Sequence, residues 1–356
     1  MTKVLLTGSA GFIGSHLCRY ILANTDWTIV GLDRIDFAGD AQRMSGLDPK
    51  RFAFVWHDLR APILGATAKR VLTGNGRLGA GPFDFVAHLA AGSHVDRSVS
   101  CPVEFFHDNV LGTVHLLEWA RNPDHLGHEG RFLYFSTDEV FGPSDDAGAF
   151  LPGDRMNPLN PYAAAKAGGE VACPAWVNTF GMRVMISHAT NFFGPGQDDE
   201  KFVPRAVKQI LAGEPVQIHT VNGEPCRRYY THVENACSAV VHMLRFGDCI
   251  DPDDASSGRY NVTGERDVSN VDLVREIGRI LGKDPIIKLV ENPPTRIRPD
   301  LSYWVSGEAL ESIGWKQGVS FEAGLKMTVE AVLAESVLDS GPVPANDNRS
   351  AHGRAG

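Results

Sequence analysis

The sequence predicts an α/β protein built on a Rossmann doubly wound parallel sheet, with a smaller C-terminal lobe. Three observations predict it: a glycine loop directly after the first apolar run, short apolar runs that alternate with longer helical stretches, and a less regular pattern after about residue 190. We assign residues 1–190 to the sheet domain, residues 191–335 mainly to the smaller lobe, and residues 336–356 to a disordered tail, because residues 339–356 lack apolar periodicity.

Six short apolar runs predict the strands of the sheet. They lie at residues 4–6, 28–32, 52–56, 83–88, 132–135 and 184–186. Ile13, Leu17 and Ile21 recur at helical spacing after the first run, and apolar residues recur in the same way over residues 103–117. Helices between successive strands are expected in a parallel sheet, because parallel neighbours need long crossovers.

Composition and charge exclude several classes of function. The net charge of −9 disfavours a general nucleic-acid surface, because duplex binding depends on clustered Lys and Arg. No apolar run approaches the ~18 to 20 residues of a membrane span, and no removable signal peptide precedes the glycine loop, so we expect a cytoplasmic protein without a membrane partner. The six cysteines form no Cys-x-x-Cys pair, which argues against a metal site and a disulfide framework.

The glycine loop predicts a dinucleotide site. Gly8, Gly11 and Gly14 stand between a predicted strand and a predicted helix, and Phe12 and Ile13 complete the loop. Without Cβ atoms the backbone turns tightly and approaches a pyrophosphate, whose charge is attracted by the N–H groups at the helix start. The alternative is a glycine-rich turn that binds no ligand.

Asp33 ends the second predicted strand, nineteen residues after Gly14. A carboxylate there accepts hydrogen bonds from the adenosine ribose and repels a 2′-phosphate, so NAD is favoured over NADP. Arg34 is a contrary indication, because its guanidinium is able to pair with such a phosphate. Further cofactor contacts are expected after the third and fourth strands, at Asp58, Leu59, Leu89, Ala90 and Ala91.

Tyr162 and Lys166 form the first part of a predicted catalytic cluster. Asn160 and Pro161 have the residue types of a helix N-cap and first position, so Tyr162 and Lys166 share one face near a helix start. A lysine ammonium and a positively charged nicotinamide favour the phenolate, which would then take a proton from a hydroxyl group. The alternative is a tyrosine and a solvated lysine without a catalytic role.

Thr137, Asp138 and Glu139 follow the fifth predicted strand, at the edge of an open parallel sheet where ligands bind. In an extended strand Asp138 would face away from its two neighbours, so a shared pocket requires a turn that ends at Gly142 and Pro143. An enclosed acid pair has divergent pKa values, which gives one acid and one base for the elimination of water. Solvated loop acids are the alternative.

The glycine loop, Ser136-Thr137-Asp138-Glu139-Val140-Phe141-Gly142 and Tyr162-x-x-x-Lys166 together resemble the extended short-chain dehydrogenase/reductases, and among them the dTDP-glucose 4,6-dehydratases. The resemblance runs from residue 1 to about residue 330. It implies an NAD-binding Rossmann domain, a nucleotide-sugar-binding lobe, a nucleotide-diphosphate sugar as substrate and a homodimer formed by the helices around residues 103–119 and 162–180.

The resemblance also implies a role for each residue of the cluster. Tyr162 and Thr137 would assist oxidation at sugar C4, with hydride passing to NAD. Glu139 would remove the C5 proton and Asp138 would protonate the departing C6 hydroxyl, before hydride returns to C6. Lys166 would hold the nicotinamide ribose and lower the pKa of the tyrosine. The product would be a 4-keto-6-deoxy sugar.

Substrate contacts implied by the resemblance are Asn191, Lys201, Arg228, Asn261 and Arg298. Two departures leave the nucleotide base open among thymidine, uridine, guanosine and cytidine. Gly92 stands where a glutamate is usual, and residues 298–303 look like a shortened base-binding loop. A 4-epimerase or a UDP-glucuronate decarboxylase, which does not require the acidic pair, is the second enzyme reading. A non-catalytic NAD-binding scaffold or sensor is the reading from another class.

Overall fold

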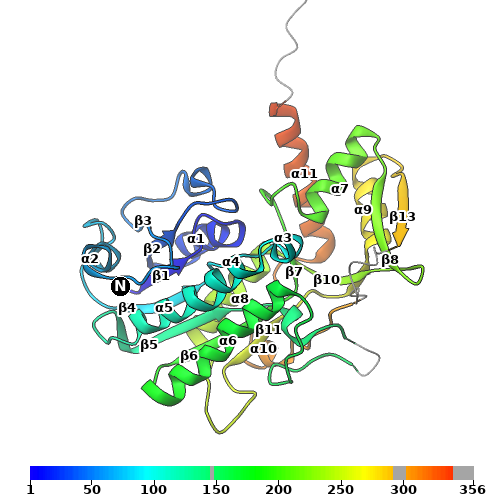
Figure 1. Cartoon of the computed structure of the whole chain (residues 1–356). Coiled ribbons are helices and arrows are strands. Elements are labelled where there is room, and N and C mark those ends of the chain that lie inside the picture. Colours follow the sequence, from blue (N-terminus) through cyan, green and yellow to red (C-terminus); the bar gives the residue numbers. More distant parts are fainter. Residues whose placement is uncertain (145–147, 292–301, 340–356) are drawn as a thin grey trace, which may run out of the picture.

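A seven-stranded sheet forms the centre of the molecule, in a computed structural model that describes residues 1–144, 148–291 and 302–339 (Figure 1). Its strand order is β11-β6-β5-β4-β1-β2-β3, and all neighbouring strands are parallel. The strands are β1 (Lys3–Thr7), β2 (Thr28–Asp33), β3 (Phe52–Trp56), β4 (Phe83–His88), β5 (Leu126–Phe135), β6 (Val184–Ala189) and β11 (Arg259–Val262). The predicted fold class is confirmed, and each of the six predicted runs forms a strand of this sheet.

Helices cover both faces of the sheet. They are α1 (Phe12–Asn24), α2 (Gly65–Thr73), α3 (Val95–Ser100), α4 (Pro102–Phe106), the π-helix η2 (His107–Leu111), α5 (Gly112–Ala120), α6 (Pro161–Phe180) and α8 (Val233–Phe246). Alternate residues of β1 belong to two different cores: Val4 and Leu6 pack with α1 and α8, whereas Leu5 packs with α5 and α6. This two-sided burial explains why the strand is apolar throughout.

The strand order reverses between β1 and β4. From β1 the chain proceeds through β2 to β3 on one side, and β4, β5, β6 and β11 lie on the other. Crossovers therefore leave in opposite directions at this point, and a crevice opens beyond the carboxyl ends of the strands. The glycine loop follows β1 at this crevice.

The smaller lobe contains two three-stranded sheets beside the large sheet (Figure 1). Its elements are β7 (Asn191–Phe193), α7 (Phe202–Ala212), β8 (Val216–Val221), β9 (Glu224–Pro225), β10 (Arg227–His232), β12 (Asp267–Ser269), α9 (Asn270–Leu281), β13 (Ile287–Glu291) and α11 (Phe321–Asp339). The short helix α10 (Glu308–Ser312) packs instead on β11 of the large sheet, and its Leu310 belongs to the core shared by α1 and α8. A third core joins α7, α9 and α11. None of the helices in the described ranges is long and apolar enough to cross a membrane.

The chain does not stay in the smaller lobe after residue 190, because α8 packs on α1 and β11 pairs with β6. The domain boundaries remain predictions, and the structure shows that α8, β11 and α10 pack with the large sheet although they follow residue 190. The helix α11 continues to Asp339, past the predicted start of the tail at residue 336, because Leu325, Val329 and Val332 pack at helical spacing into the third core. Residues 340–356 lie outside the described residues.

Candidate active site

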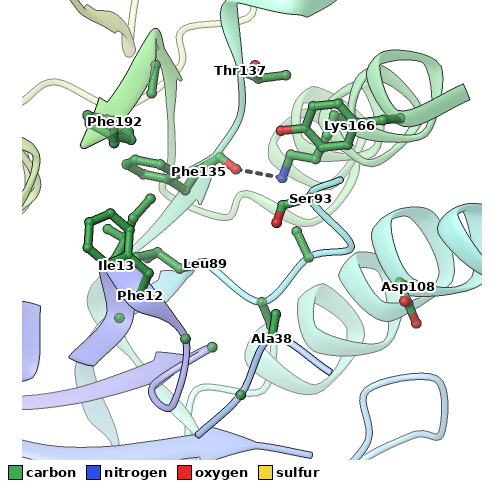
Figure 2. A pocket seen from close by; sticks show the side chains of 18 of the residues that line it. Phe12, Ile13, Ala38, Leu89, Ser93, Asp108, Phe135, Thr137, Lys166 and Phe192 are labelled. Atoms are coloured by element: carbon green, nitrogen blue, oxygen red, sulfur yellow. Dashed lines mark hydrogen bonds between the residues drawn. The ribbon is translucent and has the colours of Figure 1, made fainter. Parts of the chain in front are cut away.

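A cavity of about 310 Å³ lies at the carboxyl ends of the strands, where the strand order reverses. Predicted residues from distant parts of the sequence line it. They are Gly8, Gly11, Phe12, Ile13, Gly14, Asp33, Asp58, Leu59, Leu89, Ala90, Ala91, Thr137, Asp138, Glu139, Tyr162, Lys166, Asn191 and Lys201. Figure 2 shows Phe12 and Leu89 on one side of this space, with Thr137 and Lys166 on another.

Close backbone contacts in the glycine loop leave no room for a Cβ atom at two of its glycines. Gly8 has a φ of +75°, and a Cβ there would lie 2.8 Å from the Ala90 nitrogen. A Cβ on Gly14 would lie 2.0 Å from the Gly8 carbonyl oxygen. Gly11 caps α1 without a side-chain hydrogen bond, so the first N–H groups of this helix keep their hydrogen-bonding capacity beside the cavity. This arrangement fits the pyrophosphate of a dinucleotide.

Replacing Gly14 by alanine is expected to lower the nicotinamide cofactor content of the purified protein at least about tenfold. The new Cβ would force the Gly14 and Gly8 backbones apart and change the shape of the loop. Cofactor released by heat and measured by chromatography checks this. Gly79→Ala is the control, because a Cβ there meets nothing within 4 Å. Wild-type cofactor content in Gly14→Ala would contradict the role of the loop.

Asp33 is held between the loop and the end of β2. Its Oδ2 accepts a hydrogen bond from the Ala10 N–H at 2.9 Å, and its Oδ1 accepts one from the Ile35 N–H at 2.8 Å. Each oxygen retains a second lone pair. The carboxylate is thus fixed at the cavity wall with acceptor capacity for ribose hydroxyls.

The acidic segment after β5 turns, as predicted. The 3-10 helix η3 (Asp138–Phe141) follows the extended Thr137 and ends at Gly142, whose φ is +81°. Thr137 Oγ1 accepts a hydrogen bond from the Glu139 N–H at 3.4 Å and donates one to Asp138 Oδ1 at 3.0 Å. Because the chain turns here, all three side chains reach the cavity, which an extended strand would not allow.

The two neighbouring acids have different surroundings. Asp138 is 4% exposed, and burial, reinforced by the charge of Glu139, raises its pKa to about 7. Within the described part of the chain, its Oδ2 has no hydrogen-bond partner. Glu139 is half-buried, and its Oε2 accepts a hydrogen bond from Asn160 Nδ2 at 2.8 Å. One carboxyl is therefore suited to donate a proton near neutral pH, and the other is oriented as an acceptor.

Tyr162 and Lys166 lie one turn apart on α6. Asn160 caps this helix through its side chain and Pro161 begins it, as predicted. Lys166 is 3% exposed, and its Nζ donates a hydrogen bond to the Phe135 carbonyl at 2.6 Å (Figure 2). Burial lowers the pKa of this ammonium group to about 8. Lys166 is therefore mostly charged at neutral pH despite its burial.

The predicted lowering of the Tyr162 pKa is wrong for this structure. Burial raises the pKa of the phenol, and the charge of Glu139 raises it further, while a hydrogen bond with Thr137 acts in the opposite sense. The Lys166 ammonium group contacts the Phe135 carbonyl rather than the phenol. Here Tyr162 is a protonated phenol beside an acid.

The remaining predicted substrate contacts have different positions. Asn191 and Lys201 border the cavity from the side of the smaller lobe. Arg228, on β10, is not among the lining residues, and its guanidinium lies 5.1 Å from the centroid of the Tyr303 ring. Arg298 lies outside the described residues.

Asn261 does not reach the cavity, and its predicted substrate contact is corrected. Its side chain is fully buried and donates hydrogen bonds to the carbonyls of Phe150 and Ser306, at 3.2 and 2.9 Å. Its Oδ1 lies 3.0 Å from His188 Nδ1. The reason is that β11 carries Asn261 into the edge of the large sheet, where this side chain satisfies buried polar groups.

Glu170 and His188 are buried next to the cavity-lining residue Ser136, and no sequence motif identified them. Glu170 accepts a hydrogen bond from Ser136 Oγ at 2.6 Å and lies 2.9 Å from His188 Nε2. Burial favours the neutral acid, but His188 and Ser136 outweigh it and lower the pKa of Glu170. Spacing was the available signal, because Glu170 follows Lys166 by four residues on one helix.

A comparison with family models decides the family. The model described as the NAD dependent epimerase/dehydratase family matches residues 4–262, which include the glycine loop, the acidic turn and the start of α6. This chain belongs to that family. The resemblance to the extended short-chain dehydrogenase/reductases is confirmed.

Individual members of the NAD dependent epimerase/dehydratase family are similar over nearly the whole chain. The dTDP-glucose 4,6-dehydratase of Escherichia coli is 31% identical over 357 residues, covering 94% of this chain and 93% of that protein. The dTDP-glucose 4,6-dehydratase DesIV of Streptomyces venezuelae, solved with NAD bound, has a TM-score of 0.80 and 30% identity, and the match covers 95% of this chain and 98% of that one.

A longer relative matches in part. The trifunctional UDP-glucose 4,6-dehydratase/UDP-4-keto-6-deoxy-D-glucose 3,5-epimerase/UDP-4-keto-L-rhamnose-reductase of Arabidopsis thaliana is 33% identical over 339 residues. The match covers 92% of this chain but 46% of that protein. The chain therefore spans about half the length of this relative.

Proposed function

We propose that the chain is an NAD-dependent nucleotide-sugar 4,6-dehydratase, a hydro-lyase that converts a dTDP-glucose-like NDP-hexose to an NDP-4-keto-6-deoxyhexose and water. The observation that carries the proposal is the pair Asp138 and Glu139, with divergent surroundings, in the same cavity as Tyr162 and Lys166. The named dehydratases among the relatives support it.

The residues present fit NAD. The glycine loop would hold the pyrophosphate, Asp33 the adenosine ribose and Lys166 the nicotinamide ribose. When bound, NAD supplies reversible hydride transfer to and from the sugar. The protein then has to position the hexose, move three protons and exclude water from the cavity.

Each proton has an assigned residue. Tyr162 Oη, hydrogen bonded to Thr137, is assigned to take the proton of the C4 hydroxyl. This step needs the phenolate, which burial and Glu139 disfavour in the structure and which the positive charge of a bound nicotinamide would favour. Glu139 removes the proton at C5, which an adjacent ketone acidifies. Asp138 protonates the C6 hydroxyl as it leaves, and its unpartnered Oδ2 is the atom available for this step.

Other readings account for less of the cavity. A 4-epimerase or a glucuronate decarboxylase uses the glycine loop and the tyrosine–lysine pair, but does not need a protonated acid beside an ionised one. A non-catalytic scaffold or sensor needs neither the tyrosine–lysine pair nor the acidic pair. Incubation with dTDP- and UDP-hexoses tests the proposal: we expect the alkali-sensitive absorbance of a 4-keto sugar. Absence of product across a broad panel of sugar nucleotides would contradict it.

The dehydration rate is expected to fall as pH rises through about 7. This is the value to which burial and Glu139 raise the pKa of Asp138, and above it the acid no longer carries the proton that the leaving hydroxyl needs. A profile of kcat/KM between pH 5 and 9 measures this, because kcat/KM reports the titrating groups of the free enzyme, and Asp138→Asn should lack the inflection. A rate that climbs through this range would contradict the assignment of Asp138 as the acid.

A homodimer is part of the proposal, because an apolar stripe covers adjacent helices. Val103 on α4 is 66% exposed and Val171 on α6 is 58% exposed, and Val99 and Leu111 are exposed on the neighbouring elements. Figure 1 shows α4, α5 and α6 side by side. Exposed apolar side chains on helices that pack together are typical of an interaction site.

Replacing both Val103 and Val171 by glutamate is expected to convert the dimer to a monomer, because each subunit would bury two charges at the interface. Light scattering coupled to gel filtration measures the mass. Leu64→Glu is the control, because Leu64 is 68% exposed but precedes α2, away from the stripe. A wild-type protein that elutes as a monomer would contradict the dimer.

A further inference from the structure

Arg34 follows the ribose-binding candidate Asp33, yet its guanidinium is fully engaged by protein carboxylates. Nη1 and Nη2 donate to Asp108 Oδ1 and Oδ2, at 2.6 and 2.9 Å, and Nε donates to Asp36. The Asp108 side chain is only 11% exposed, so this bidentate pair is protected from solvent. A phosphate would have to displace a carboxylate to reach Arg34.

A local irregularity of the helix positions Asp108. Asp108 lies in the π-helix η2 between α4 and α5, a wide turn that is rare and concentrated at functional sites. The next residue, Asn109, exchanges hydrogen bonds with the backbone of Gly92, at 2.8 and 3.1 Å. A Cβ on Gly92 would lie 3.2 Å from the Phe105 ring and 3.5 Å from Asp108 Oδ2. Gly92 therefore packs tightly against the Phe105 ring of α4 and lies next to the Asp108 carboxylate.

We propose that Asp108 is a specificity-determining residue for the cofactor: it holds Arg34, the cation at the end of β2, in a closed ion pair that a 2′-phosphate would have to break. The inference rests on the proposed NAD site. This wall of the cavity carries four carboxylates and two guanidinium groups, so its net charge is 2 − 4 = −2. The carboxylates belong to Asp33, Asp36, Asp58 and Asp108, and the guanidinium groups belong to Arg34 and Arg60. The wall therefore repels a phosphate and accepts a ribose diol.

The test compares variants in which the repulsion by Asp33 is already removed. Each protein is unfolded and refolded, or exchanged, in equal concentrations of NAD and NADP, and the bound nucleotides are released by heat and quantified. In Asp33→Asn/Asp108→Asn we expect the bound NADP:NAD ratio to exceed that of Asp33→Asn about tenfold, because Nη1 and Nη2 of Arg34 lose their bidentate carboxylate partner while Asp36 still orients Nε. Asp33→Asn/Asp36→Asn is the matched control and should change the ratio less than about twofold, because the bidentate pair remains.

A ratio that is unchanged by Asp108→Asn, in protein that still takes up NAD, would overturn the inference. Arg34→Gln provides an independent check that does not depend on folding of the Asp108 variant. In the Asp33→Asn protein it should leave the ratio within about twofold, because Arg34 is already sequestered; a tenfold fall would show that Arg34 reaches the phosphate despite Asp108. Wild-type protein that takes up neither nucleotide would instead overturn the proposed function, and this inference with it.

Discussion

Asp138→Asn and Glu139→Gln are each expected to lower kcat for dehydration about 10³-fold, within the range for loss of a positioned acid or base. Asparagine keeps the hydrogen bond that Thr137 donates to the side-chain oxygen but has no proton to give to the leaving hydroxyl. Glutamine keeps an oxygen for Asn160 but cannot take the C5 proton. Initial rates at saturating sugar nucleotide measure both effects.

Asp198→Asn is the matched control, because Asp198 also lines the cavity but is paired with Arg43. It should retain kcat within a few fold of wild type. If the Asp138 and Glu139 variants keep most of the wild-type dehydration rate, the acidic pair has no role in the elimination of water.

The second large effect is expected for Tyr162→Phe, with kcat about 10³-fold lower and unchanged cofactor content. Removing the phenol oxygen removes the group that takes the C4 hydroxyl proton, whereas the ring still packs edge-on against Phe105. Thr137→Ser should keep most of the activity, because serine retains the hydroxyl that hydrogen bonds to Tyr162. A Tyr162→Phe enzyme with wild-type turnover would remove Tyr162 from the mechanism.

Local signals predicted most of the large sheet and of the cavity. The glycine loop, the cap at Asn160 and the turn after Thr137 are each specified by residues only a few positions apart. The carboxyl ends of parallel strands meet at one edge, so residues that follow β1, β4 and β5 were expected to converge. They line one cavity in the structure.

The residues whose positions differ from the prediction are placed by contacts between distant parts of the sequence. Asn261 was assigned by resemblance, but β11 pairs with β6 and buries it against His188, 73 residues earlier. The Arg34–Asp108 pair spans 74 residues and depends on a π-helix that no local pattern announced. The pKa of Tyr162 depends on where the Lys166 ammonium group points, which helical spacing alone does not determine.

Mass spectrometry of dTDP-glucose before and after incubation with the NAD-loaded enzyme tests the central claim most directly. We predict that the sugar nucleotide loses one water with the wild-type enzyme and does not with the Asp138→Asn/Glu139→Gln protein. A sugar nucleotide converted by the wild-type enzyme to an isomer of unchanged mass would contradict the claim.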